Sequence, residues 1–116
     1  MKQNLKKRVR FGRLFDIYGG LLTKKQQQCL KLYFHEDLSL TEIAEELEVS
    51  RQAIHDILKR SEQLLEKHEN RLELLLREDS ERKMMELVLN LLETGDASKK
   101  ARALKILNKM CSKDDY

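Results

Sequence analysis

The stretch from Ser39 to Lys67, SLTEIAEELEVSRQAIHDILKRSEQLLEK, constrains the fold more than any other part of the sequence. It begins with Ser39-x-x-Glu42, a pair whose side chains satisfy the free amides at a helix start. Apolar or small residues then follow at helical spacing, namely Leu40, Ile43, Ala44 and Leu47. Ser50 is suited to cap a second helix, whose inward face would hold Ile54, Ile57 and Leu58.

The three residues between these helices, Glu48 to Ser50, leave room only for a tight turn. Ala44 is small enough to let two steeply crossing helices approach, and Val49 would fill the corner between them. A short helix, an apolar corner and a capped longer helix make a helix-turn-helix. Many such motifs have glycine where Glu48 stands, because that residue often needs a positive φ. Glu48 therefore predicts a less typical turn.

The segment SLTEIAEELEVSRQAI resembles the last helix-turn-helix of bacterial sigma factors, which reads the promoter −35 element. The match extends upstream to Leu22-Thr23-x-x-Gln26 and Leu32-Tyr33, and downstream through Lys59-Arg60. Residues 9 to 78 together resemble the YlxM (UPF0122) family, small bacterial proteins named for a helix-turn-helix and for association with the signal recognition particle pathway. The resemblance implies a sigma-region-four-like bundle and a partner in that pathway.

The composition predicts an all-α protein, because 116 residues include no proline and only four glycines. We expect a helix-turn-helix domain over residues 1–78, with the motif at 39–67 and the long recognition helix running to about residue 77. The polar run Arg77 to Lys83 predicts a bend, with Ser80 available as a cap. Residues 79–116 would form a C-terminal helical hairpin broken at Gly95, with Asp96 or Ser98 capping the last helix. The hairpin would either form a dimer interface or pack within one chain.

Two helices are expected before the motif. The first would bury Val9, Phe11, Leu14, Phe15, Ile17 and Tyr18 and end at Gly19-Gly20. Residues 1–14 carry six basic side chains and no acid, which suits either a solvated end or an arm on phosphate or RNA. Thr23 and Gln26 form a capping box for a helix from Lys24 to about Phe34.

The candidate nucleic-acid-binding residues follow from the motif. Arginine and glutamine pair with guanine and adenine edges, and the start of a recognition helix enters the major groove. The set comprises Ser50, Arg51, Gln52, His55, Lys59 and Arg60 on the second helix, with Lys24 and Lys25 as phosphate contacts. Asp56 opposes DNA binding, as does the acidic block over residues 36–48.

Other classes of function find little support. No nucleophile has a base at suitable spacing and no glycine-rich loop is present, so we expect no enzyme, no catalytic residues and no cofactor. The three histidines and two cysteines lack metal-ligand spacing. No apolar run approaches the roughly 20 residues of a membrane span. The unpatterned Cys29 and Cys111 suit reduced thiols in the cytoplasm.

Three hypotheses remain. The first is a homodimeric DNA-binding regulator, whose long helix and hairpin would pair two reading heads. The second is an accessory factor that contacts signal recognition particle RNA or its GTPase without binding DNA, which only the resemblance supports. The third is a partner of RNA polymerase, which ranks last because the other sigma-factor modules are absent.

Overall fold

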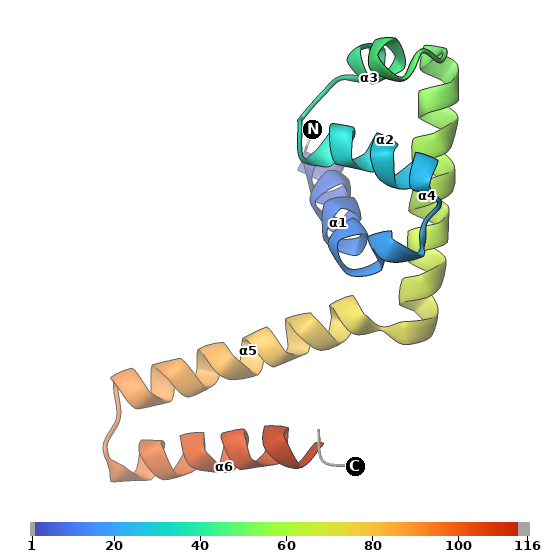
Figure 1. The fold of residues 1–116 in the computed structure, drawn as a ribbon. Coiled ribbons are helices and arrows are strands. Elements are labelled where there is room, and N and C mark those ends of the chain that lie inside the picture. Colours follow the sequence, from blue (N-terminus) through green and yellow to red (C-terminus); the bar gives the residue numbers. More distant parts are fainter. Residues whose placement is uncertain (1, 114–116) are drawn as a thin grey trace. The chain divides into compact units, whose positions relative to one another are not determined.

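The computed structural model describes residues 2–113, and that part of the chain contains six α-helices and no strand (Figure 1). The all-α prediction is therefore confirmed. The helices are α1 (Lys2–Tyr18), α2 (Lys24–Phe34), α3 (Leu40–Leu47), α4 (Arg51–Leu72), α5 (Leu74–Glu93) and α6 (Ala97–Lys113), with a 3-10 turn, η1 (Gly19–Leu21), after α1. Residues 1 and 114–116 lie outside the described part.

The chain divides into two compact units, residues 1–75 and 76–116, each with its own apolar cluster. The division falls after Leu75, whereas the sequence suggested one after residue 78. No helix among the described residues is long and apolar enough to cross a membrane.

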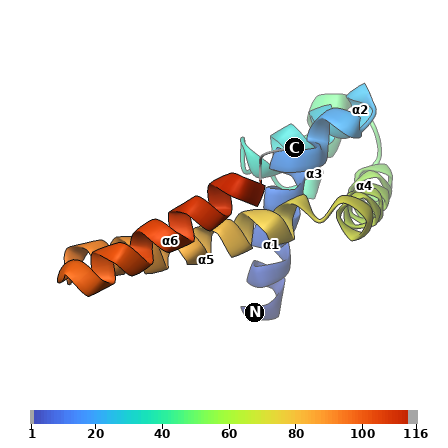
Figure 2. The same cartoon turned by 90° about the horizontal axis from the view of Figure 1, so that it is seen from below.

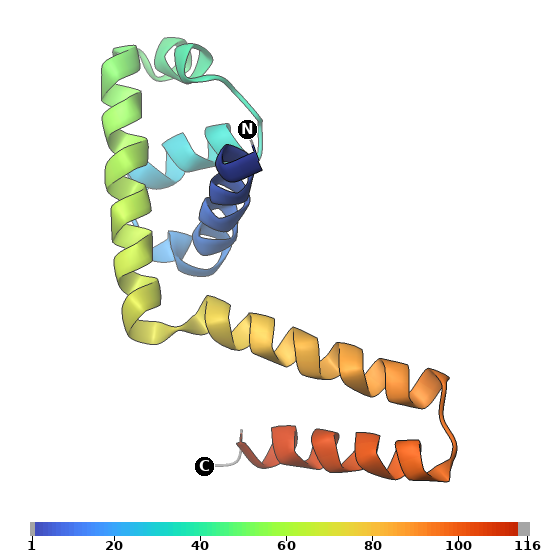
Figure 3. The ribbon, with the colours of Figure 1, turned by 180° about the vertical axis from the view of Figure 1, so that it is seen from behind.

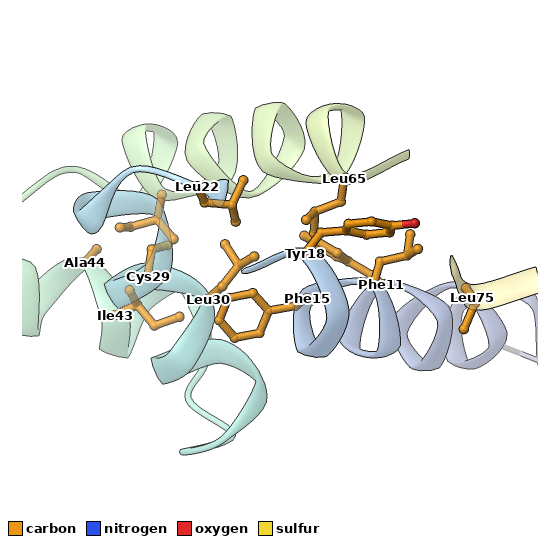
Figure 4. Packing of buried hydrophobic residues seen from close by; sticks show 12 residues of the cluster. Phe11, Phe15, Tyr18, Leu22, Cys29, Leu30, Ile43, Ala44, Leu65 and Leu75 are labelled. Atoms are coloured by element: carbon orange, nitrogen blue, oxygen red, sulfur yellow. The ribbon is translucent and has the colours of Figure 1, made fainter. Parts of the chain in front are cut away.

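In the first unit, α4 runs beside α1, α2 and α3 and supplies one wall of the core (Figures 1 and 3). The side chains that meet there come from all four helices (Figure 4). Those with no exposed surface are Leu14, Cys29, Leu30, Ile43, Ile54 and Leu65. Burying one such leucine or isoleucine stabilises the fold by about 1.5–3 kcal/mol. The long helix is thus held mainly by the three helices packed against it.

Local chemistry sets where these helices begin. Thr23 and Gln26 form the expected capping box on α2, and Ser39 and Glu42 form the second one on α3. The Ser50 hydroxyl accepts a 3.0 Å hydrogen bond from the Ala53 amide at the start of α4. The predicted caps Thr23, Ser39 and Ser50 are therefore confirmed.

The buried face of α1 agrees with the sequence except at one residue. Val9 is 55% exposed, whereas Phe11, Leu14 and Phe15 are buried. After Tyr18 the chain tightens into η1. A Cβ atom on Gly19 would lie 2.8 Å from the Phe15 ring, so glycine is required at this close approach.

The predicted end of the long helix is wrong. α4 ends at Leu72, not near residue 77, and Glu73 takes a left-handed conformation with φ 54° and ψ 32°. Buried polar groups fix this break: the Tyr18 hydroxyl accepts a hydrogen bond from the Leu74 amide, and Glu69 Oε1 accepts one from the Leu75 amide. These contacts satisfy backbone donors at the start of α5 that would otherwise lack partners.

The bend predicted at Arg77 to Lys83 is also wrong. This run lies inside α5, and Ser80 is therefore not a cap. The charges alternate at helical spacing, so that Arg77 pairs with Glu81 at 3.1 Å and Arg82 with Glu78 at 3.6 Å. Pairs of this kind support an exposed helix rather than interrupt it.

In the second unit, α5 and α6 lie side by side as a hairpin (Figures 1 and 2). Val88, Leu91 and Ala103 form its small core. Asp96, rather than Ser98, caps α6, since its carboxylate accepts a 3.0 Å hydrogen bond from the Lys99 amide. Exposed apolar side chains remain at Met85, Leu87, Leu89, Leu92 and Leu104.

Candidate nucleic-acid interface

The turn between α3 and α4 positions the candidate interface. Glu48 is in the left-handed region, with φ 55° and ψ 44°, which is the conformation that glycine often supplies at this point. The next amide, that of Val49, donates a 3.0 Å hydrogen bond to the Ala44 carbonyl. Ala44 is buried and Val49 is half-buried in the corner. The helix, turn and helix thus have the local arrangement expected from the sequence.

This turn leaves the first turns of α4 open to solvent on one side. Ile54 is fully buried against the core, while the side chains on the opposite face are exposed. The exposed set comprises Arg51, Gln52, His55, Lys59 and Arg60, and Ser50 is exposed next to them with its hydroxyl engaged in the cap. The structure therefore places five of the eight sequence-predicted residues on α4 and a sixth, Ser50, at its N-cap.

An acidic residue lies within this exposed set. Gln52 donates a 3.1 Å hydrogen bond from Nε2 to Oδ1 of Asp56, and the same oxygen lies 3.8 Å from Nδ1 of His55. Asp56 thereby restrains the glutamine amide that would read a base, and it places a negative charge between two candidate contacts. A duplex would have to meet or displace this carboxylate.

The other two predicted residues, Lys24 and Lys25, lie in the first turn of α2 and are exposed. In residues 2–113 the structure gives no hydrogen bond or ion pair that joins them to the exposed face of α4. They remain separate basic side chains on a neighbouring helix.

Helix α3 carries an exposed acidic surface, formed by Glu42, Glu45 and Glu46, with Glu48 in the turn. Hydrogen bonds from the backbone amide and the hydroxyl of Ser39 lower the pKa of the Glu42 carboxyl below its ordinary value. This helix corresponds in order to the one that crosses the phosphate backbone in DNA-bound motifs. Its charge disfavours close contact between that surface and phosphate.

Two arginines of the basic N-terminal segment have structural roles that the sequence did not reveal. Arg8 donates hydrogen bonds from Nη2 to the Tyr33 carbonyl at 2.9 Å and to Asp37 at 3.0 Å. Arg10 makes a two-pronged pair with Glu66, at 2.7 and 2.9 Å. These contacts tie α1 to the end of α2 and to α4. The segment is helical, and two of its arginines are bound to other parts of the same chain. It is therefore not a free arm.

A cleft of about 520 Å³ opens beside the exposed face of α4, and we call it the α1–α4 cleft. Its lining residues are Asn4, Lys7, Arg8, Phe11, Tyr33, Leu40, His55, Leu58, Lys59 and Glu62. A second hollow shares Lys7, Lys59 and Glu62 with it and continues along α4 to Glu66, Lys67 and Asn70. Sequence reasoning missed this cleft because its residues come from distant segments. The sequence signal that was available is the spacing of four between His55 and Lys59, which puts both side chains on the same face of a helix.

Metal chemistry finds no support in the described part of the chain. No group of three or more histidine, cysteine, aspartate or glutamate side chains within residues 2–113 is placed to hold a metal ion.

Comparison with known proteins points to one family. Residues 5–107 match the family described as "UPF0122: Putative helix-turn-helix protein, YlxM / p13 like". The chain is 50% identical over 92 residues to "UPF0122 protein YlxM" of Bacillus subtilis, covering 79% of this chain and 83% of that protein. It is 51% identical over 87 residues to a UPF0122 protein of Desulforamulus reducens (72% and 74%), and 44% identical over 109 residues to one of Bacillus pumilus (90% and 98%).

Proposed function

Because the chain belongs to the UPF0122 family of YlxM/p13-like helix-turn-helix proteins, we propose that it is a regulatory protein that binds duplex DNA with the first turns of α4. In this proposal the motif acts as the sigma region-four motif does, with α4 as the recognition helix. The protein works in the cytoplasm and has no catalytic activity.

The observation that carries the proposal is the exposed face of α4. Arg51 and Gln52 are exposed in its first turn, immediately after the left-handed turn residue Glu48. Recognition helices contact base edges with residues at this end. Lys59 and Arg60 follow two turns later, where they would contact phosphate and make binding dependent on salt.

We further propose that the protein acts as a homodimer through α5 and α6. Support comes from the apolar side chains that the hairpin leaves exposed, among them Leu89 at 59% and Leu104 at 60%. Helix-turn-helix dimers read palindromic sites whose half-sites lie about 34 Å apart in successive major grooves, and we propose that this dimer reads such a site.

The test is fluorescence anisotropy at two salt concentrations. Three labelled probes are compared: random duplex DNA, a selected pool of palindromic duplexes, and signal recognition particle RNA. We expect a selected duplex to bind more tightly than random DNA at physiological salt. The double variant Arg51→Ala/Gln52→Ala should lose this preference by about tenfold or more, since each base contact is worth about 1–3 kcal/mol.

The control is the double variant Lys24→Ala/Lys25→Ala, which should weaken binding to all duplexes alike, because phosphate contacts carry no sequence information. Circular dichroism would verify that both variants keep their helix content. A sequence preference that survives in the Arg51/Gln52 variant would show that α4 is not the recognition helix.

The acidic surface of α3 favours a second candidate function. Four exposed glutamates there, from Glu42 to Glu48, suit a basic protein better than a phosphate backbone. In this alternative the protein is an accessory factor that contacts signal recognition particle RNA or its GTPase and does not bind DNA. Tight RNA binding, with DNA affinity that disappears as salt rises, would favour it over the first proposal.

A further inference from the structure

The α1–α4 cleft combines charged and apolar side chains in a space suited to a small molecule. Its volume of about 520 Å³ lies within the range of roughly 300–1,000 Å³ typical of ligand sites. Phe11, Tyr33, Leu40 and Leu58 provide apolar surface, and Asn4 adds an amide at the side of α1. Such a lining suits a ligand that has both a flat apolar part and a polar part.

The charge of the lining selects an anion. Lys7 and Lys59 line the cleft together with one carboxylate, that of Glu62, while the charge of Arg8 is paired with Asp37 at 3.0 Å. Within residues 2–113 the structure gives neither Lys7 nor Lys59 an ion-pair partner. His55 lies at the same cleft. The two lysines, one from α1 and one from α4, are therefore available to an anionic group between the helices.

The arginine in the cleft is restrained in a way that suits a planar ring. The guanidinium carbon of Arg8 lies 4.1 Å from the centre of the Tyr33 ring, and Nη2 is hydrogen-bonded to the Tyr33 carbonyl and to Asp37. The side chain is about one-third exposed. Unpaired bases stack on aromatic rings and on guanidinium planes. A preformed arginine-tyrosine stack provides such a platform without the entropic cost of ordering a free side chain.

We propose that the α1–α4 cleft binds a nucleotide, with its base against the Arg8–Tyr33 stack and its phosphate between Lys7 and Lys59. Two sources share this chemistry: a free mononucleotide, and an unpaired nucleotide within a single-stranded RNA. The second hollow adds Lys67 beyond the shared Lys7 and Lys59, which would accommodate the next phosphate of a strand.

This site goes beyond the proposed reading of duplex DNA and does not depend on it. One consequence does rest on the proposed function. His55 and Lys59 belong both to the cleft and to the candidate DNA-contacting face. A nucleotide in the cleft would then compete with duplex DNA for these two side chains, so that an occupied cleft lowers DNA affinity.

The experiment uses the full chain labelled with ¹⁵N and monitors amide chemical shifts by NMR. The probes are the four ribonucleoside 5′-monophosphates, ribose 5-phosphate, inorganic phosphate, and a mixed-sequence single-stranded RNA of about ten nucleotides. We expect shifts at Lys7, Arg8, Tyr33 and Lys59. The probes that carry a base should bind at least about tenfold more tightly than ribose 5-phosphate, since stacking one base is worth about 1–3 kcal/mol.

The variants Lys7→Gln and Lys6→Gln form a matched pair. Both lysines are exposed neighbours on α1, but Lys6 lines neither hollow. Each substitution removes one positive charge and leaves the core untouched. We expect Lys7→Gln to weaken binding about tenfold, as for loss of a charged hydrogen bond, and Lys6→Gln to weaken it less than about threefold.

Mononucleotide binding that depends on Lys7 supports a free nucleotide as the ligand. RNA binding with the same dependence, without mononucleotide binding, supports the strand. No shifts in the cleft, equal losses in the two variants, or ribose 5-phosphate binding as tightly as the nucleotides would each overturn the proposal. Duplex DNA binding is measured on the same samples. The DNA titration tests the proposed function and the nucleotide titration tests the cleft, so that either proposal can fail without the other.

Discussion

The Tyr18 hydroxyl donates a 2.7 Å hydrogen bond to Oε1 of Glu69, and both side chains are buried. The same two groups accept hydrogen bonds from the Leu74 and Leu75 amides. One tyrosine on α1 and one glutamate on α4 therefore determine where α4 ends and where α5 begins. His68 lies beside this pair, with its ring 5.9 Å from that of Tyr18.

Replacing Tyr18 with phenylalanine should destabilise the fold by about 1–3 kcal/mol, because Glu69 and the Leu74 amide would lose a buried partner. The free energy of unfolding from urea titration measures this loss. Tyr33→Phe is the matched control, because the Tyr33 hydroxyl has no hydrogen bond within residues 2–113. This substitution should lower the free energy of unfolding by less than about 0.5 kcal/mol. Equal losses in the two variants would contradict the role assigned to Tyr18.

Stability should decline at alkaline pH. Burial raises the pKa of the Cys29 thiol, and burial together with the hydrogen bond to Glu69 raises the pKa of Tyr18. Both groups ionise more readily in the unfolded chain. Their contribution to stability is therefore complete below about pH 8.5 and is lost as the pH rises through the ordinary thiol and phenol range.

Cys29→Ala should reduce the slope of unfolding free energy against pH between about 8.5 and 10, whereas Cys111→Ala, at an exposed position, should leave it unchanged. Urea titrations at successive pH values provide the measurement. An unchanged slope in Cys29→Ala would show that the thiol is not protected by the folded state.

Replacing Glu48 with glycine should raise the free energy of unfolding by about 0.5–1 kcal/mol. A left-handed conformation destabilises a non-glycine residue by about 1–2 kcal/mol, and glycine removes this strain. Because glycine also has greater entropy in the unfolded chain, the net gain is smaller than the strain removed. The control is Glu45→Gly, inside α3, which should lower stability by about 1 kcal/mol. A loss of stability in Glu48→Gly would mean that the glutamate side chain compensates for its backbone strain.

Asp56→Asn should increase affinity for random duplex DNA by about threefold or more at low salt, because it removes a negative charge from the candidate DNA-contacting face. The gain should shrink as salt rises. Glu86→Gln makes the same charge change in the second unit, outside the unit that carries that face. Anisotropy titrations that show the same gain in both variants would indicate a general charge effect and no specific contact by α4.

Leu89→Glu should convert a dimer into a monomer. Met85, Leu89 and Leu92 are exposed at spacings of four and three on α5, so they form one stripe beside the hairpin core. Leu87 is also exposed but lies off this stripe, which makes Leu87→Glu the control. Light scattering after gel filtration gives the mass directly. A wild-type monomer, or dissociation by both variants alike, would argue against a dimer formed through this stripe.

The local elements were largely predictable. The caps at Thr23, Ser39 and Ser50 depend only on residues up to three positions away, and apolar periodicity placed Ile54 correctly on the buried face of α4. The exposed candidate residues on α4 follow from the same periodicity, because a helix that buries one face exposes the other. Whether they contact nucleic acid stays a prediction.

The end of α4 and the α1–α4 cleft were not predictable in this way. Helical periodicity continues past Leu72, yet a buried glutamate and a tyrosine from α1 decide that the helix breaks there. The cleft depends on α1 lying against α4 with Lys7 near Lys59, residues far apart in the chain. By itself the sequence determined the helices, their caps and their buried faces, since these depend on near neighbours. Only the tertiary structure decided the helix break and the cleft, because both arise from side chains that meet after the chain has packed.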